Sequence, residues 1–172
     1  MNIVLCGMMG SGKSTVGVAL SRLTGKPFVD TDTLIEEKYG SINEIFTKKG
    51  EAYFRDLETQ AVKELALKDG LIIATGGGLV LRQENADLLK QNGRIVYLQA
   101  KLSTLRERLS GDTKRPLLQS GRLEELLEKR APVYESAADF TVQADGKTPE
   151  EIAGEIIKKV VPEKQTGRAG MR

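Results

Sequence analysis

Short apolar runs alternate along the chain with stretches in which apolar residues recur every three or four positions. We predict buried β-strands at 2–6, 28–29, 71–74, 95–98 and 140–142. After the first run, a helical pattern begins at Val16 and continues until Gly25 and Pro27 end it. Strands that alternate with helices pair in parallel, and helices cover both faces of a parallel sheet. The pattern therefore predicts an α/β fold.

Capping residues mark two of the expected helix starts. Ser41 and Glu44 have the spacing of a capping box, in which each side chain bonds to the backbone N–H of the other residue. Thr148, Pro149 and Glu151 combine a cap, a first-turn proline and a reciprocal acid. Both sites predict the first turn of a helix.

Two segments interrupt the alternation of strands and helices. Residues 33–67 are mostly helical in pattern, whereas residues 110–122 are polar and contain glycine and proline, which is typical of a mobile loop. Inserted segments of this kind often handle substrates. No repeat or linker divides the chain, so we expect one domain over 1–172, with a frayed polar tail at 162–172.

The composition narrows the possible chemistry. The 172 residues include no histidine and one cysteine, Cys6. This excludes a Ser/His/Asp or Cys/His nucleophile system, an imidazole metal site and a disulfide within the chain. Carboxylates, lysine, arginine, hydroxyls and backbone amides remain as functional groups. We expect Cys6 to be a small buried apolar residue at a strand end.

The charge balance argues against two classes of partner. Lys and Arg number 26 against 24 Asp and Glu, so the chain lacks the concentrated basic field that nucleic acids and membrane surfaces attract. No apolar run approaches the roughly 18 residues of a membrane span, and the start lacks the pattern of a signal peptide. We therefore expect a cytoplasmic protein that binds neither nucleic acid nor membrane.

The clearest motif is GMMGSGKS at residues 7–14, in which two glycines separated by four residues precede a lysine and a hydroxyl. Small residues let backbone N–H groups surround an anion at the start of the next helix. Lys13 can then reach the terminal phosphates of a nucleotide, and Ser14 can bind Mg²⁺. A structural glycine turn would need neither side chain. The motif therefore predicts nucleotide binding.

Two carboxylates follow the second predicted strand, near the predicted phosphate loop. Asp30 can hold a water on Mg²⁺, and Asp32 can orient an acceptor hydroxyl toward the γ-phosphate. The alternative is that one of them caps the next helix. The strand at 71–74 has no aspartate in the usual Walker B position, so Asp30 is also the candidate for the second acid near the metal.

Three consecutive glycines, at 76–78, follow the third predicted strand, where a single glycine would suffice for a turn. They indicate either a ligand against bare backbone or a flexible strand exit. Arg55, with Glu58 as a plausible orienting partner three residues on, and Arg130 lie in helical patterns, where a lone arginine is usually solvated. Arg115 lies in the polar loop, from which a cation can neutralise charge during phosphoryl transfer.

Taken in order, these motifs resemble those of the shikimate kinase family, in the nucleoside-monophosphate-kinase-like branch of P-loop proteins. The similarity runs from about residue 2 to residue 159 and rests on GMMGSGKST, DTD at 30–32, FRDLE at 54–58, GGG at 76–78, RPLL at 115–118 and KRAPVYE at 129–135. It implies a three-layer P-loop kinase fold with a five-stranded parallel sheet in the order 2-3-1-4-5. It also implies a small helical substrate-binding insertion at about 33–67 and a lid at about 110–122.

The resemblance further implies a role for each matching residue. For ATP, these residues are Gly10, Ser11, Gly12, Lys13, Ser14, Thr15, Arg108, Arg115 and Lys147. For shikimate, they are Asp32, Arg55, Gly76, Gly77, Gly78 and Arg130. Ser14 and, through water, Asp30 would hold Mg²⁺, and Lys13, Asp32 and Arg115 would be catalytic. Lys147 departs from the arginine of many family members, which stacks better on a base.

The implied reaction is ATP-dependent phosphorylation of the 3-hydroxyl of shikimate, giving shikimate 3-phosphate and ADP, on the way to chorismate and the aromatic amino acids. We expect direct in-line transfer within a monomer, with no phosphoenzyme. Two alternatives remain open on the residues alone. One is another small-molecule kinase, acting on gluconate or a nucleoside monophosphate, and the other is a non-catalytic ATP-binding module.

Overall fold

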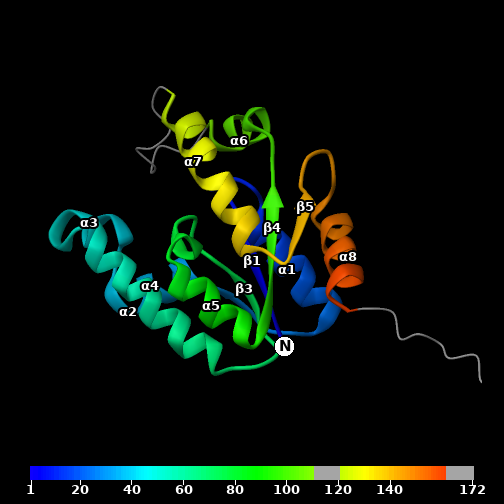
Figure 1. The fold of residues 1–172 in the computed structure, drawn as a ribbon, viewed down its shortest axis with the longest axis horizontal. Coiled ribbons are helices and arrows are strands. Elements are labelled where there is room, and N and C mark those ends of the chain that lie inside the picture. Colours follow the sequence, from blue (N-terminus) through cyan, green and yellow to red (C-terminus); the bar gives the residue numbers. More distant parts are fainter. Residues whose placement is uncertain (111–120, 162–172) are drawn as a thin grey trace, which may run out of the picture.

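A five-stranded parallel sheet forms the centre of the computed structural model, which describes residues 1–110 and 121–161 (Figure 1). Its strands are β1 (Asn2–Cys6), β2 (Phe28–Asp30), β3 (Ile72–Ala74), β4 (Gly93–Gln99) and β5 (Phe140–Gln143). They lie in the order β2-β3-β1-β4-β5, with Val4 of β1 between Ile73 and Ile95. The predicted strands and their order are confirmed, and β4 extends beyond the expected 95–98.

Helices cover both faces of the sheet. They are α1 (Lys13–Thr24), α2 (Thr31–Tyr39), α3 (Ile42–Lys49), α4 (Glu51–Ala66), α5 (Gln83–Gln91), α6 (Leu102–Leu109), α7 (Arg122–Ala137) and α8 (Pro149–Val160), with a 3-10 turn η1 (Leu79–Leu81). Figure 1 shows α1 and α8 on one face, and α5 and α7 on the other. The three-layer arrangement agrees with the prediction.

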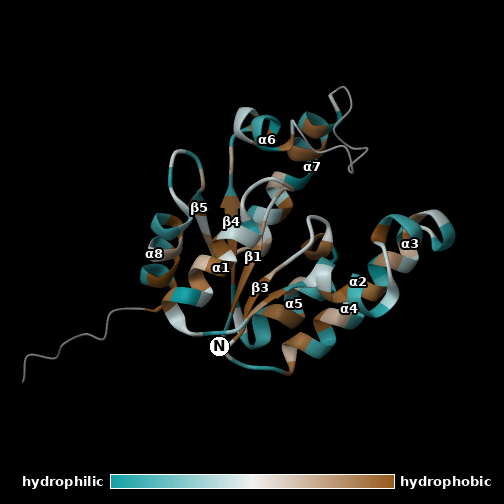
Figure 2. Cartoon of the chain, turned by 180° about the vertical axis from the view of Figure 1, so that it is seen from behind, coloured by the Kyte–Doolittle hydropathy of each residue, from teal (hydrophilic) through white to brown (hydrophobic). Residues whose placement is uncertain are grey.

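The main hydrophobic core lies between the sheet and these helices. All five residues of β1 are buried, and Val4, Leu5 and Cys6 have no exposed surface. Figure 2 shows apolar strands at the centre and polar outer faces on the helices. Cys6 is therefore the buried apolar residue that the sequence predicted, and burial raises the pKa of its thiol to about 12.

Helices α2, α3 and α4 fill the segment predicted as a helical insertion, and they stand beside the sheet (Figure 1). They share a small core of their own, formed by Ile35, Ile45, Phe54, Leu57 and Ala61. Helix α2 begins at Thr31, two residues before the expected start of the insertion, because the Asp30 carboxylate caps it by accepting the N–H groups of Asp32 and Thr33.

One of the two predicted helix caps is confirmed. The Thr148 hydroxyl accepts the N–H of Glu151 at 3.2 Å, as expected. The capping box at Ser41 is wrong, because the Ser41 side chain makes no capping hydrogen bond there. The N–H of Ile42, in the first turn of α3, donates to the carboxylate of Glu36 at 3.4 Å.

Two predicted segments reach beyond the described residues. Residues 111–120 of the expected lid, which include Arg115, and the expected tail at 162–172 lie outside them. Within the parts that are described, the structure contains no helix that is both long enough and apolar enough to span a membrane.

Candidate active site

The phosphate loop joins the end of β1 to the start of α1. Its three glycines, Gly7, Gly10 and Gly12, have φ values of 144°, 81° and 97°, which side-chain-bearing residues rarely adopt. The ammonium of Lys13 donates to the carbonyls of Gly7 and Met8, at 2.7 and 2.9 Å. The loop therefore has the strand-loop-helix form that its motif predicted, with the Lys13 amine held against it.

Asp30 connects this loop to α2 by using its two carboxylate oxygens separately. Oδ1 accepts the N–H groups of Asp32 and Thr33, at 3.0 and 3.2 Å, so the capping alternative is confirmed for Asp30. Oδ2 accepts the hydroxyl of Ser14 at 2.9 Å. A hydroxyl beside a carboxylate offers the hard oxygen donors that Mg²⁺ prefers, so this pair fits the expected metal.

The glycine turn at 76–78 packs directly against charged side chains. An added methyl group would lie 2.5 Å from Oδ1 of Asp32 at Gly76, and 2.4 Å from Nη1 of Arg55 at Gly78. At Gly77 it would lie 3.2 Å from Nη1 of Arg130 and 3.9 Å from the backbone N of Met9 in the phosphate loop. None of these glycines adopts left-handed φ, so they provide space rather than backbone freedom.

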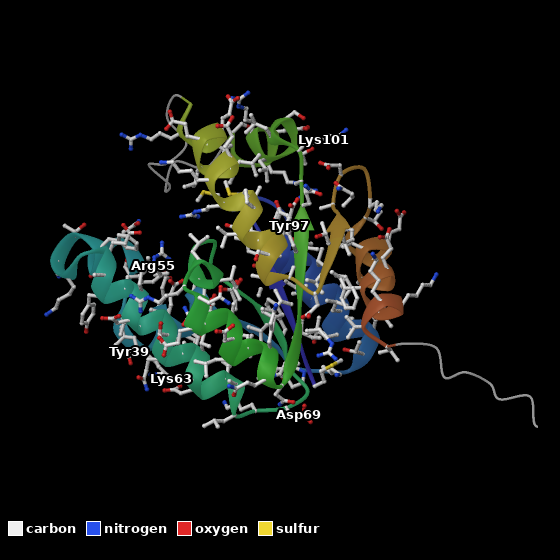
Figure 3. The ribbon with its side chains drawn as sticks, in the orientation of Figure 1. Tyr39, Arg55, Lys63, Asp69, Tyr97 and Lys101 are labelled. Atoms are coloured by element: carbon white, nitrogen blue, oxygen red, sulfur yellow. The ribbon has the colours of Figure 1, made fainter. Side chains whose placement is uncertain are left out.

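The turn therefore brings together three side chains that are distant in the sequence. Asp32 lies in the first turn of α2, Arg55 lies on α4 and Arg130 lies on α7. Figure 3 shows Arg55 on the side of α4 that faces the rest of the molecule. We call Asp32, Arg55, Arg130 and the glycine turn the acceptor cup. It stands beside the phosphate loop.

Arg55 is held by a buried carboxylate. Its Nη1 donates to Oε1 of Glu58 at 2.7 Å, and its Nη2 to Glu51 at 3.3 Å. The Arg55 side chain is 21% exposed and that of Glu58 is 1% exposed, so this arginine is not on a solvated face. Burial raises the pKa of Glu58, and Arg55 partly offsets that effect. The predicted orienting role of Glu58 agrees with this contact.

Two cavities flank the phosphate loop. The larger, of about 380 Å³, is lined by Gly10, Ser11, Gly12, Thr15, Val16, Arg108, Lys147, Pro149 and Ile152. The smaller, of about 230 Å³, is lined by Met9, Gly10, Gly12, Lys13, Ser14, Thr15, Asp30, Asp32, Thr75, Gly76 and Gly77. The structure thus places Arg108 and Lys147 on one side of the loop, and both acids and two of the turn glycines on the other.

Both cationic residues of the larger cavity have protein partners. Arg108 donates to the carbonyl of Gly10 at 3.2 Å, and Lys147 pairs with Glu155 at 2.7 Å. The residues alone did not assign a role to Arg108, because no local sequence pattern places a residue of α6 against a loop 98 positions earlier.

Several residues that support the site carry no signal in the sequence that would single them out. The Thr31 hydroxyl accepts the N–H of Gly76 at 3.0 Å, and the Tyr134 hydroxyl donates to the carbonyl of Gly77 at 2.5 Å. Asp145 accepts the Thr104 hydroxyl at 2.6 Å and so joins the loop before α8 to α6. Thr31 and Tyr134 lie inside motifs that were recognised, DTD and KRAPVYE, but their partners are remote in sequence.

The sheet order, the glycine-lysine-serine loop after β1 and the acidic end of β2 define a P-loop protein of the nucleoside-monophosphate-kinase-like class. The family model described as shikimate kinase matches residues 9–161. A shikimate kinase from Thermodesulfovibrio yellowstonii is 48% identical over 163 residues, covering 92% of this chain and 94% of that protein. The chain belongs to the shikimate kinase family.

Solved structures agree with this assignment. The structure of shikimate kinase from Acinetobacter baumannii in complex with shikimate has a TM-score of 0.89 and 38% identity, and the match covers 95% of this chain and 94% of that one. Shikimate kinase from Aquifex aeolicus has a TM-score of 0.82 and 41% identity, covering 91% of this chain and 94% of that chain.

Proposed function

We propose that this protein transfers the γ-phosphate of ATP to the 3-hydroxyl of shikimate, giving shikimate 3-phosphate and ADP. Membership of the family supports the activity. The observation that carries the proposal is the acceptor cup: Asp32, Arg55 and Arg130 meet around one glycine turn, beside the phosphate loop.

The acceptor cup suits a small anionic polyol. Two guanidinium groups, of Arg55 and Arg130, provide paired donors for a carboxylate, and the fixed geometry of arginine favours bidentate contacts. The carboxylate of Asp32 accepts hydrogen bonds from ring hydroxyls. The Glu58 carboxylate keeps the Arg55 guanidinium in place, so little ordering of that side chain remains to be done on binding.

ATP is assigned to the other side of the phosphate loop. The backbone of residues 10–15 would surround its phosphates, and the cavity beside Arg108 and Lys147 is the candidate for the adenosine part. Ser14 directly, and Asp30 through a water, would hold Mg²⁺. When bound, the metal supplies positive charge to the β- and γ-phosphate oxygens.

The transfer is proposed to be direct. The acceptor oxygen forms a bond to the γ-phosphorus as the bond from that phosphorus to the bridging oxygen breaks, and ADP leaves. Asp32 orients the acceptor hydroxyl and accepts its proton, while Lys13 offsets the negative charge on the transferring group. Arg115, which lies outside the described residues, is assigned a similar charge role by resemblance alone.

Acceptor specificity is the experiment that tests this function. ADP release is followed with shikimate, gluconate or AMP as the acceptor, with Lys13→Ala as the control for background ATP turnover. We expect shikimate alone to give rapid ADP release in the wild type. Faster release with gluconate or AMP would assign the site to another small-molecule kinase, and ATP binding without transfer to any acceptor would indicate a binding module.

We also propose that one chain suffices for the reaction and that the protein acts in the cytoplasm, where ATP is available. The acceptor cup and both cavities beside the phosphate loop are formed within one chain, which supports the proposal that no second chain is needed to complete the site. Activity that is proportional to protein concentration down to the monomeric range would agree with this proposal. Loss of specific activity on dilution would contradict it.

A further inference from the structure

Tyr134 lies at the centre of the molecule, one helical turn after Arg130 on α7. Its side chain has no exposed surface. The ring packs against that of Tyr97 on β4, with 5.2 Å between the ring centroids and 32° between the planes. Figure 3 shows Tyr97 where α7 crosses β4. Two buried tyrosines therefore stand side by side beneath the acceptor cup.

The hydroxyl of Tyr134 is directed at the glycine turn. It donates to the carbonyl oxygen of Gly77 at 2.5 Å and lies 3.9 Å from the sulfur of Met8 in the phosphate loop. Burial raises the pKa of this hydroxyl to about 12, although the nearby Arg130 acts in the opposite direction. Tyr134 therefore remains a proton donor at every pH at which the protein is expected to work.

A hydrogen bond at this carbonyl fixes more than one atom. The carbonyl of Gly77 and the N–H of Gly78 belong to the same planar trans peptide unit, in which C=O and N–H point in opposite directions. With the oxygen held toward Tyr134, the N–H of Gly78 is directed away from Tyr134. Gly78 itself stands against the guanidinium of Arg55, since an added methyl group would lie 2.4 Å from Nη1.

Glycine is the residue least able to hold such a peptide in place by itself, because it has no side chain and the widest choice of backbone angles. A separate hydrogen bond anchors the first residue of the turn: the N–H of Gly76 donates to the Thr31 hydroxyl at 3.0 Å. The Gly77–Gly78 peptide is anchored by Tyr134. Removing the Tyr134 hydroxyl would also leave a carbonyl of the turn without this partner.

We propose that Tyr134 is a positioning residue for the acceptor: its hydroxyl orients the Gly77–Gly78 peptide so that the Gly78 N–H is presented beside Arg55 as a further donor to an anionic acceptor. The inference rests on the proposed function. Helix α7 would then have two roles in the acceptor cup: Arg130 contributes a guanidinium, and Tyr134 fixes the backbone of the glycine turn against which the acceptor lies.

The test compares Tyr134→Phe with Tyr97→Phe. Each variant loses one hydroxyl from a buried ring of the same pair, so the losses of packing are matched. For Tyr134→Phe we expect the KM for shikimate to rise about 3- to 10-fold, the effect of one hydrogen bond, with the KM for ATP and kcat within about 2-fold of wild type. For Tyr97→Phe the KM for shikimate, the KM for ATP and kcat should all stay within about 2-fold of wild type. A change of that size is too small to assign to a lost hydrogen bond.

Hydrogen exchange of the unliganded proteins gives a second measurement that does not depend on catalysis. The segment 75–81 should exchange faster in Tyr134→Phe than in Tyr97→Phe, when both are compared at equal distance below their melting temperatures. An unchanged KM for shikimate in Tyr134→Phe, or equal rises in the KM for ATP and shikimate, would overturn the inference. So would equal exchange in the two variants. An inactive wild type would instead overturn the proposed function on which it rests.

Discussion

At the residue scale, the site depends on carboxylates whose surroundings differ sharply. Asp30 divides its oxygens between a helix cap and the Ser14 hydroxyl. Asp32 lies in the first turn of α2 and packs against the bare backbone at Gly76. Glu58 is buried beneath the cup, where it holds Arg55. The same functional group therefore anchors backbone, lines the acceptor cup or orients a cation, according to what surrounds it.

The role of Asp32 leads to the first prediction. In Asp32→Asn the side chain keeps its shape but loses its charge and its capacity to take a proton, so kcat should fall about 100-fold or more. The KM for ATP should stay within about 2-fold, because the nucleotide is assigned to the other side of the loop. Steady-state kinetics would check both values. Near-normal turnover would remove Asp32 from catalysis.

A matched control for this variant is Asp56→Asn. Asp56 is 73% exposed on α4, where it pairs with Arg82. The Asp56→Asn variant loses the same charge at a position outside the acceptor cup, so the kcat of this variant should equal that of the wild type. A comparable loss of activity in both variants would mean that the effect of Asp32→Asn comes from net charge.

The second prediction concerns Glu58 and pH. Burial raises the pKa of this carboxyl above its ordinary value of 4.5, with Arg55 acting in the opposite direction. A raised pKa favours the folded chain while the group is protonated, and this stabilisation is lost as the pH rises from 4.5 through the raised value. Glutamine does not titrate. The stability of Glu58→Gln relative to wild type should therefore increase with pH across that window and then level off.

Urea unfolding of the two proteins, from about pH 4 to pH 7, would measure this difference. Because both chains share every other titrating group, the pH dependence of the difference in unfolding free energy reports the titration of Glu58 and its coupling to Asp32. A difference that is independent of pH, or that decreases as the pH rises, would contradict a raised pKa for this carboxyl.

Local contacts between residues were predictable from the sequence, and remote ones were not. The Arg55–Glu58 pair follows from helical spacing, since residues three apart lie on one face of a helix. The hydrogen bond from Tyr134 to Gly77 joins positions 57 apart, and nothing in the local pattern indicates it. A tyrosine on a helical motif is consistent with any buried position in the core.

At the element scale, the glycine turn between β3 and η1 is the part of the site that no helix or strand could replace. Its three residues bring backbone to within contact distance of Asp32, Arg55 and Arg130. The sequence indicated that three glycines exceed the needs of a turn. Two reasons were left open: a flexible exit from the strand, or a need for bare backbone beside a ligand. The close contacts of Asp32, Arg55 and Arg130 with the turn favour the need for bare backbone.

The third prediction tests this space requirement. In Gly78→Ala the new methyl group must displace the guanidinium of Arg55 and so disturb its bond to the buried Glu58 carboxylate. We therefore expect the KM for shikimate to rise about tenfold, the equivalent of about 1.4 kcal/mol, and the melting temperature to fall. Kinetics and a thermal melt on the same preparation would measure both. An unchanged KM would show that the contact does not matter for the acceptor.

Gly154→Ala is the matched control. Gly154 lies inside α8, where an added methyl group meets no atom within 4 Å. Alanine favours a helix interior over glycine by about 1 kcal/mol, so this variant should be more stable than wild type and fully active. A loss of acceptor affinity in Gly154→Ala would indicate a general effect of glycine replacement.

The positions of strands and helices were predicted better than their ends. Continuous apolar runs indicate buried strands, and all five strands were predicted from such runs. The capping box at Ser41 failed: the Ser41 side chain makes no capping hydrogen bond, and the Glu36 side chain, from the preceding helix, accepts the N–H of Ile42. Side chains from outside a local motif can bind the N–H groups of a first turn, and the tertiary structure decides which of them come close enough.

At the scale of the whole molecule, parallel strand order places distant segments around one loop. The phosphate loop follows β1, which lies between β3 and β4, so the ends of β2 and β3 stand to one side of it and α6 and α8 to the other. The sequence supplied the motifs and their chemistry. Two cavities lie against the same loop because of the strand order, and the residues alone did not predict that order.

We propose that a phosphoryl group passes from a nucleotide on one side of the loop to a hydroxyl in the acceptor cup. Phosphorus-31 NMR of a mixture of the protein, ATP, Mg²⁺ and shikimate would detect that transfer. We expect one new phosphate ester, coupled to the proton on carbon 3 of shikimate and equimolar with ADP. Inorganic phosphate without an ester, or an ester at another hydroxyl, would contradict it.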